Sequence, residues 1–390
     1  MLRNQVINVK RTRSNAAACA DSRHLTCLEA AVDPSKLGDS TLTFPGGIQL
    51  SFANTIPPNP YAYHYIGTEG EAELVFNPET GGMHGHFQWK DKSYVLEYLG
   101  TGAGHVWKEI NVQNLEEQEG VDYVEDPAAT RFNHYELVRQ AAADNTTIAR
   151  YSIKFYYTQD FATVTPDIDG FIDLVLAETN QGYINSGVPL IAYKFCQELA
   201  TISDGVDGST MLSNFANMKD TATALRGSAD AAALLVNNLV NCGIAYLNTI
   251  SSGYTLSVTA KSCATGYYSF GHELGHNFGL AHNLEVMTNS LYPHGHGHHI
   301  AQGSAATGYR TIMAYQTKGH SERVNYYSNP SITFSKTGTS TGVEGLSNNA
   351  AVLMVNRMSF AGIGDESGTC ESTNLPQTSM NNTQNGNALK

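Results

Sequence analysis

The stretch that decides the fold is "HELGHNFGLAH", residues 272–282, which sets three histidines and a glutamate in a fixed order. Positions four residues apart lie on one face of a helix, so His272 and His276 can direct both imidazoles at one centre. Gly279 follows three residues later, where glycine accepts the left-handed conformation that ends a helix and turns the chain. That turn brings His282 back towards the same centre.

Three neutral imidazoles leave one coordination position open on a Zn²⁺ ion, and an open position distinguishes a catalytic zinc site from a structural one. Glu273 lies beside this centre, from where its carboxylate can take a proton from a metal-activated water. Average residue usage gives such a pattern by chance in about one chain in ten thousand. We therefore predict Zn²⁺ with His272, His276 and His282 as metal ligands and Glu273 as the catalytic general base.

The same residues resemble the extended zinc signature of the metzincin metallopeptidases. Met313, in "TIMAY" at residues 311–315, resembles the Met-turn of that clan, which implies that it packs beneath the three imidazoles. A methionine without this motif upstream would be interpreted as a core filler. Tyr315 follows Met313 by two residues, as in astacins and serralysins. The resemblance implies a catalytic phenol that stabilises an oxyanion, and a packed aromatic ring is the alternative.

The resemblance extends over about 149–362 and is to bacterial reprolysin-like metallopeptidases, including the peptidyl-Asp metalloendopeptidases. It rests on segments such as "FIDLVLAETNQGYINSGVPLIAYKF", "ADAAALLVNNLVNCGIAYL" and "GYRTIMAYQ". Asn283 departs from the snake-venom and adamalysin branch, which usually has Asp after the third histidine. The fold implied is an α/β metzincin catalytic domain with a mixed sheet and a zinc-binding helix.

Hydrophobic periodicity and turn residues predict the elements of this region. We expect strands at 149–161, 188–196, 242–249 and 254–261, and helices at 166–184, 229–240, 267–280 and 349–362. Because the strand at 242–249 precedes the motif helix, we expect an extended substrate to add to its edge.

Three regions are predicted along the chain. Residues 1–144 alternate apolar and polar positions between Gly and Pro turns, which predicts a smaller β-rich domain followed by an acidic linker. Residues 145–365 form the catalytic domain, and 366–390 are a polar tail that we expect to be disordered. Domains preceding metzincins are propeptides that block the zinc with a cysteine or an aspartate. Neither short motif is evident, so we predict latency, with activating cleavage at 139–150, and leave the blocking ligand unnamed.

Composition limits the partners and the location of the protein. The 390 residues include 23 Lys and Arg against 36 Asp and Glu, a net charge of 23 − 36 = −13, which argues against nucleic acid. No apolar run approaches the ~18 residues of a membrane span, and no signal-peptide core is evident at the start. Six cysteines favour disulfides in a secreted protein, with reduced buried thiols as the alternative. Cys242 and Cys263 are a possible pair, and we expect a monomer.

Two further features bear on the cleft. Four histidines within 292–301 could bind a second metal, but without carboxylates we expect a flexible loop at the rim of the cleft. Arg310, Lys318 and Arg323 are the cations that could give an electropositive pocket for an acidic substrate side chain.

The sequence therefore predicts a secreted zinc metalloendopeptidase, made as a latent precursor, that acts on proteins or peptides. One alternative is a non-proteolytic zinc-binding adhesion or toxin module, in which Glu273 would be expected to be replaced. A second alternative is a zinc hydrolase acting on a non-peptide amide.

Overall fold

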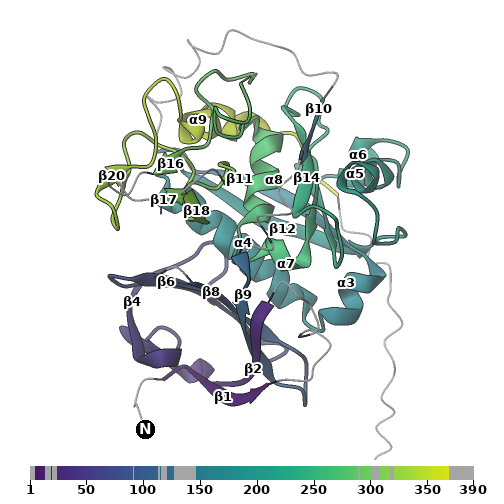
Figure 1. Ribbon diagram of the computed structural model, residues 1–390. Helices are drawn as coiled ribbons and strands as arrows, with labels where there is room; N and C mark the ends of the chain where they lie inside the picture. Colours follow the sequence, from purple (N-terminus) through teal and green to yellow (C-terminus); the bar gives the residue numbers. More distant parts are fainter. Residues whose placement is uncertain are drawn as a thin grey trace, which may run out of the picture.

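Two β-sheets form the body of the protein, seen here in a computed structural model (Figure 1). The structure describes residues 5–13, 19, 24–90, 92–112, 115, 121–126, 146–288, 290–300, 308–316 and 320–368. Most of the tail predicted at 366–390 therefore lies outside the described residues. No helix within these ranges has the length and apolar character needed to cross a membrane.

The first sheet is antiparallel and contains nine strands in the order β1-β2-β9-β8-β7-β6-β5-β4-β3. Its elements are β1 (Ile7–Arg13), β2 (His24–Val32), β3 (Thr41–Phe44), β4 (Ile48–Thr55), β5 (Ala62–Ile66), β6 (Gly70–Asn77), β7 (Gly82–Trp89), β8 (Lys92–Tyr98) and β9 (His105–Ile110), with 3₁₀ turns η2 (Pro34–Lys36) and η3 (Pro45–Gly47). The residues just before β1 contact β3, the last strand in this order. Gln5 forms a β-bridge with Thr43, and the Val6 N–H donates to the Thr43 carbonyl at 3.2 Å. The sheet thus curls around its own apolar core.

The second sheet is mixed and has six strands in the order β10-β14-β15-β13-β11-β12. Its strands are β10 (Tyr123–Glu125), β11 (Ala149–Tyr157), β12 (Leu190–Leu199), β13 (Ala231–Val236), β14 (Gly243–Leu247) and β15 (Leu256–Ala260). The pairing of β14 with β15 is antiparallel, and the other pairs are parallel. Shorter strands near the C-terminus are β16 (His299–Ile300), β17 (Gly308–Arg310), β18 (His320–Arg323), β19 (Thr333–Phe334) and β20 (Thr339–Ser340).

Helices cover both faces of the mixed sheet. They are α3 (Gln159–Val164), α4 (Ile168–Asn185), α5 (Gly208–Ala216), α6 (Ala222–Arg226), α7 (Lys261–Ala264), α8 (Ser269–Phe278) and α9 (Asn349–Phe360). Apolar residues of α4, α8 and α9 share one core cluster, whereas those of α5 and α6 share another. The helices predicted at 166–184, 267–280 and 349–362 are confirmed as α4, α8 and α9.

The helix predicted at 229–240 is wrong, because the structure has strand β13 (Ala231–Val236) there. All six residues of β13 are buried. Ala233 and Leu235 join the cluster that contains α4 and α8, while Leu234 and Val236 join the cluster on the opposite face. A strand buried on both faces shows no apolar alternation, so periodicity cannot separate it from a buried helix.

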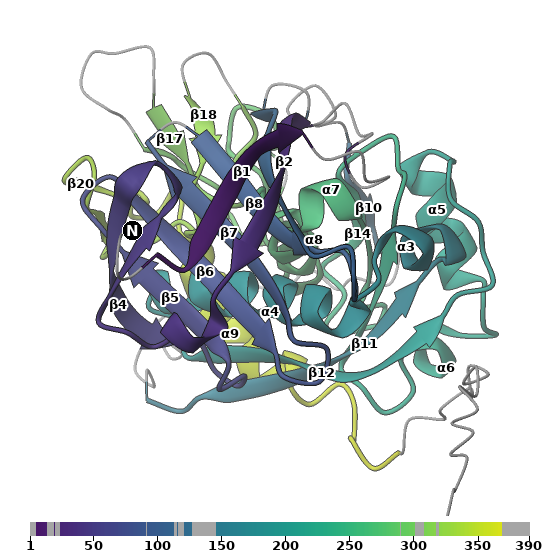
Figure 2. The same ribbon diagram turned by 90° about the horizontal axis from the view of Figure 1, so that it is seen from below.

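Helix α4 lies between the two sheets (Figures 1 and 2). Its Leu174 and Ala177 pack with Ile56 and Val75 of the N-terminal region. At the start of the helix, the Asp167 carboxylate caps the Gly170 N–H and accepts hydrogen bonds from Asn77 and Thr80. The N-terminal sheet therefore packs against the half of the molecule that carries the histidine motif.

Candidate metal centre

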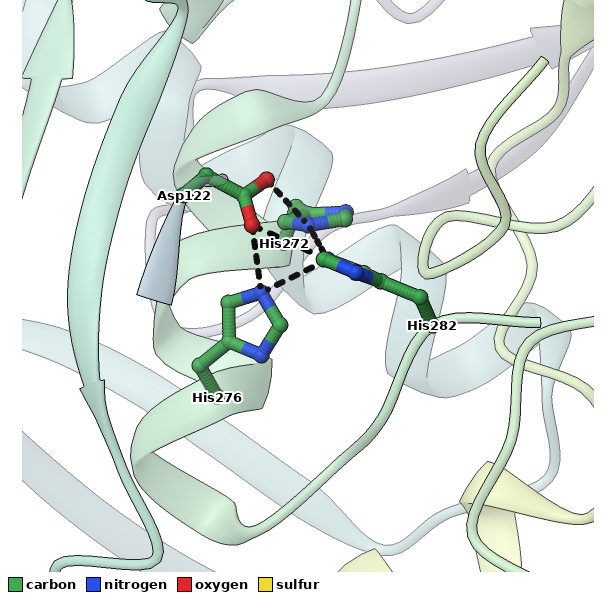
Figure 3. Close-up of side chains that lie close together, drawn as sticks. All are labelled: Asp122, His272, His276 and His282. Atoms are coloured by element: carbon green, nitrogen blue, oxygen red, sulfur yellow. Dashed lines mark hydrogen bonds and ion pairs between the residues drawn. The ribbon is translucent and has the colours of Figure 1, made fainter. Parts of the chain in front are cut away.

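The three motif histidines converge as predicted from their spacing (Figure 3). His272 and His276 project from α8, and Gly279 ends the helix with a φ of +95°. The chain then turns and brings His282 back, so that its Nε2 lies 3.2 Å from His272 Nε2 and 3.0 Å from His276 Nε2. All three side chains are buried.

Backbone carbonyls orient two of these rings. His272 Nδ1 lies 2.8 Å from the Ile312 carbonyl, and His276 Nδ1 lies 3.0 Å from the Leu280 carbonyl. A carbonyl oxygen only accepts, so each Nδ1 carries the proton and each neutral ring directs its Nε2 lone pair at the common centre. Burial lowers the pKa of His272 to about 3 and also lowers the pKa of His282, which keeps those rings neutral.

A fourth group, the carboxylate of Asp122, meets the three imidazoles (Figure 3). Its oxygens lie 3.0 Å from the Nε2 atoms of His272 and His282 and 3.3 Å from that of His276. Four electron-pair donors thus face one point, an arrangement that fits a divalent cation such as Zn²⁺.

Asp122 comes from the segment predicted to be a linker. Residues 123–125 instead form β10, which pairs in parallel with β14 at the edge of the mixed sheet. The Ala245 N–H donates to the Asp122 carbonyl at 2.9 Å, so the backbone holds the carboxylate in place. Asp122 could not be singled out from the sequence, because it is one of many acids in this stretch and only the adjoining "YV" signals a strand.

Glu273 lies beside the centre and not in it. Its side chain is buried, and its Oε2 has no hydrogen-bond partner among the described residues. Burial and then the charge of Asp122 raise its pKa well above the ordinary glutamate value. A Cβ at Gly243 of β14 would lie 2.3 Å from Glu273 Oε1, so a glycine is required where the strand passes this carboxylate.

Met313 and Tyr315 flank the histidines on other sides. Met313 is fully buried, and a Cβ at Gly275 would lie 2.6 Å from its sulfur, so the methionine packs closely against α8. The Tyr315 ring stacks on the His282 ring with centroids 4.0 Å apart. Asn283, which departs from the adamalysin pattern, accepts a hydrogen bond from the Tyr315 N–H at 2.9 Å and thereby fixes the backbone of Tyr315.

The histidines at 292–301 do not form a loose rim loop, and that expectation is wrong. His294 and His296 are buried, and His296 Nδ1 lies 2.7 Å from the His282 carbonyl. His299 Nε2 lies 2.8 Å from the Tyr315 carbonyl. An imidazole N–H can donate a hydrogen bond to a buried backbone carbonyl. Through such contacts these rings support the backbone of His282 and Tyr315 beside the centre.

Of the three predicted cations, Arg323 reaches the centre. It lines a small cavity together with Asp122, Gly243, His272 and Glu273. Arg310 is fully buried and donates to the Ala314 carbonyl and to the Tyr267 hydroxyl, each at 2.7 Å. Lys318 lies outside the described residues.

Disulfides join Cys242 to Cys263 and Cys19 to Cys27. The first confirms the pair considered from the sequence. It ties the residue that precedes β14 to α7, directly before the motif helix. The disulfide therefore links the start of β14 to the segment that leads into the motif helix α8.

Comparisons with known proteins agree with this geometry. Residues 149–328 match the model of metallo-peptidase family M12. A "Peptidyl-Asp metalloendopeptidase" of Pseudomonas fragi is 33% identical over 157 residues, which cover 40% of this chain and 85% of the relative. Proteins of the same name are 29% identical in Stenotrophomonas maltophilia (strain K279a) and 26% identical in Xanthomonas campestris pv. campestris. These alignments cover 74% and 87% of this chain, and 69% and 80% of the relatives. The chain therefore belongs to metallo-peptidase family M12 and is a metalloendopeptidase.

Proposed function

We propose that this metalloendopeptidase hydrolyses peptide bonds with a Zn²⁺ ion held by His272, His276 and His282. The observation that carries the proposal is the convergence of three Nε2 atoms and one carboxylate, all buried and all within 4.8 Å of one another. Bound Zn²⁺ would act as a Lewis acid on the scissile carbonyl and would acidify the attacking water. Support for a metzincin arrangement comes from the mixed sheet, the histidine-bearing α8 and Met313 packed against it.

Glu273 is assigned the role of general base. Its carboxylate follows the first ligand, His272, in the sequence and lies between α8 and β14 without coordinating the centre. From there it would remove a proton from the attacking water and deliver it to the leaving amine. The Tyr315 phenol is proposed to stabilise the oxyanion, which is supported by the stacking of its ring on His282.

The full chain is proposed to be a latent precursor in which Asp122 is the blocking ligand. Three imidazole ligands leave one position open on zinc, and the Asp122 carboxylate lies where a fourth ligand would bind. Strand β10 also covers the edge of β14 against which an extended substrate would pair. Activation would then require that residues 121–126 leave the cleft. Cleavage within 139–150 would separate this segment, at the end of the proposed N-terminal domain, from the catalytic half.

Substrates are proposed to be extended peptides that replace β10 at the edge of β14. The relatives are named for peptidyl-Asp substrates, and we extend to this chain a preference for aspartate beside the scissile bond. An extracellular location is supported by the disulfides Cys19–Cys27 and Cys242–Cys263, since such bonds persist in oxidising compartments.

The test uses four versions of the full chain: wild type, Asp122→Ala, Asp122→Ala combined with Glu273→Gln, and Glu125→Ala as control. Glu125 lies on the same strand as a matched acidic residue, but its side chain is exposed. Zinc content is measured by mass spectrometry of the metal, and hydrolysis is measured on casein. We expect one zinc per chain in all four versions and hydrolysis of casein by Asp122→Ala. Adding Glu273→Gln should reduce the rate of this hydrolysis by about 10²-fold to 10⁴-fold.

Each outcome separates one part of the proposal. If Asp122→Ala were as inactive as wild type and the Glu125→Ala control while a chain cleaved within 139–150 was active, Asp122 would not be the blocking ligand. If no version cut any peptide, with or without that cleavage, the alternative of a non-proteolytic zinc-binding module would be favoured over a peptidase. If Glu273→Gln retained full activity, another group would be the base.

A further inference from the structure

Arg323 is the basic residue nearest the centre among those the structure describes. It ends β18 and lines the small cavity beside Glu273, His272 and Gly243. The side chain is 5% exposed, so its charge lies in an environment of low dielectric where an opposite charge is strongly attracted. The free space in the cavity is about 10 Å³, roughly that of one water molecule, so a substrate side chain would enter only once Asp122 has left.

The guanidinium of Arg323 is held in position by Tyr267. Its Nη1 donates to the Tyr267 carbonyl at 3.1 Å, and its Cζ lies 4.4 Å from the centre of the Tyr267 ring. Arg310 holds the same tyrosine from another side through a 2.7 Å hydrogen bond to its hydroxyl. A cation whose geometry is fixed in advance loses little conformational freedom when it binds a ligand.

Arg323 lies beside the reacting groups, because it lines the same cavity as His272 and Glu273. A substrate side chain that contacts this guanidinium would therefore lie close to the scissile bond. Asp122 lines this cavity as well, so a carboxylate of the chain itself already faces it.

We propose that Arg323 binds the side-chain carboxylate of an aspartate next to the scissile bond and thereby determines specificity. A guanidinium matches a carboxylate in two parallel hydrogen bonds, whereas a neutral amide offers no charge. Burying an unpaired carboxylate is unfavourable, so Arg323 compensates the desolvation of the aspartate. This inference rests on the proposed peptidase function and adds the residue that selects the substrate.

The experiment compares Arg323→Met, Arg323→Lys and Arg150→Met in full chains that also carry Asp122→Ala. Arg150 is a matched control because its guanidinium likewise lies over a tyrosine ring, Tyr193, at 5.6 Å, but on an exposed surface. The substrates are four peptides identical except for Asp, Asn, Glu or Ala at one position. Cut sites and kcat/KM are measured for each, and binding of the same peptides is measured with Glu273→Gln added to prevent cleavage.

For Asp122→Ala alone and for Arg150→Met we expect the Asp peptide to be preferred over the Asn peptide by about 100-fold. Arg323→Met should remove most of this preference, in binding as well as in kcat/KM, while cleavage of the Ala peptide is retained. Arg323→Lys should retain part of it, because the charge remains but the paired hydrogen bonds do not.

If Arg323→Met kept the Asp preference, or if both Arg323 variants lost all four peptides equally while holding zinc and remaining folded, the specificity role would be refuted. If Arg323→Met did not fold, an unchanged Asp preference in Arg323→Lys would refute it and a reduced one would support it. Failure of the Asp122→Ala chain itself to cut or bind any of the peptides would count against the proposed function instead.

Discussion

At the scale of single residues, the centre depends on side chains that the motif contains and on others that it does not. His272, His276 and Glu273 could be predicted because helix geometry fixes their relative positions within a few residues. Asp122 and Gly243 could not, since each reaches the centre from a strand far away in the sequence. Pattern alone does not specify which of many acids or glycines is brought there.

Replacing Gly243 by alanine should impair catalysis without loss of zinc. The added methyl group would lie 2.3 Å from Glu273 Oε1 and displace that carboxylate, and the three atoms nearest to it all belong to Glu273. In a chain made active by Asp122→Ala, we expect kcat to fall by about 100-fold, because a displacement near 1 Å has such an effect on a reacting group. Ala245→Gly, on the same strand, is the control for any loss of activity that comes from a less stable strand and not from Glu273. Full activity of Gly243→Ala would show that Glu273 tolerates the shift.

At the scale of elements, the sequence predicted most of the catalytic half and failed where an element is stabilised by its neighbours. Helix α8 has local signals, namely the spacing of its histidines and the Gly279 that ends it. Strand β13 was mistaken for a helix because both of its faces are buried. Strand β10 was assigned to a linker, since three residues in an acidic stretch acquire extended structure only by pairing with β14.

The pairing of β10 with β14 should contribute to latency beyond the Asp122 contact. Val124→Pro removes a backbone donor in the middle of β10 and should weaken the ladder, whereas Val124→Thr keeps a β-branched residue. We expect the proline variant of the full chain to hydrolyse casein several-fold faster than wild type, and the threonine variant to match wild type. Equal rates for all three would mean that the Asp122 carboxylate is sufficient for inhibition.

At the scale of the whole molecule, the two regions are more closely joined than the sequence indicated. Composition and turn signals predicted a β-rich region before the catalytic one, but not that the nine strands would pack onto α4. Buried ionisable groups lie at this contact. Glu178 of α4 accepts two hydrogen bonds from the Gly266 N–H, at 3.0 and 3.1 Å, with Glu73 and His86 of the N-terminal sheet nearby.

Glu178 should make the folded chain less stable at alkaline pH. Burial, followed by the charge of Glu73, raises its pKa from 4.5 to about 8, against the opposing effect of His86. The folded state therefore holds a proton that the unfolded state releases, and this stabilisation is lost as pH rises from about 4.5 to about 8. We expect Glu178→Gln to raise the Tm relative to wild type at pH 9 more than at pH 5. The exposed Glu79→Gln should show no such difference, and equal shifts at both pH values would contradict the assignment.

The position of α4 between the two sheets affects the order in which parts of the chain can fold during synthesis. Ribosomes release a protein from its N-terminus, so the nine strands can fold before residues 168–185 emerge. Leu174 and Ala177 then meet a surface that already exists, formed in part by Ile56 and Val75. The N-terminal sheet would then act as a template for folding, whereas a catalytic half synthesised alone would have to fold with that side of α4 exposed to water.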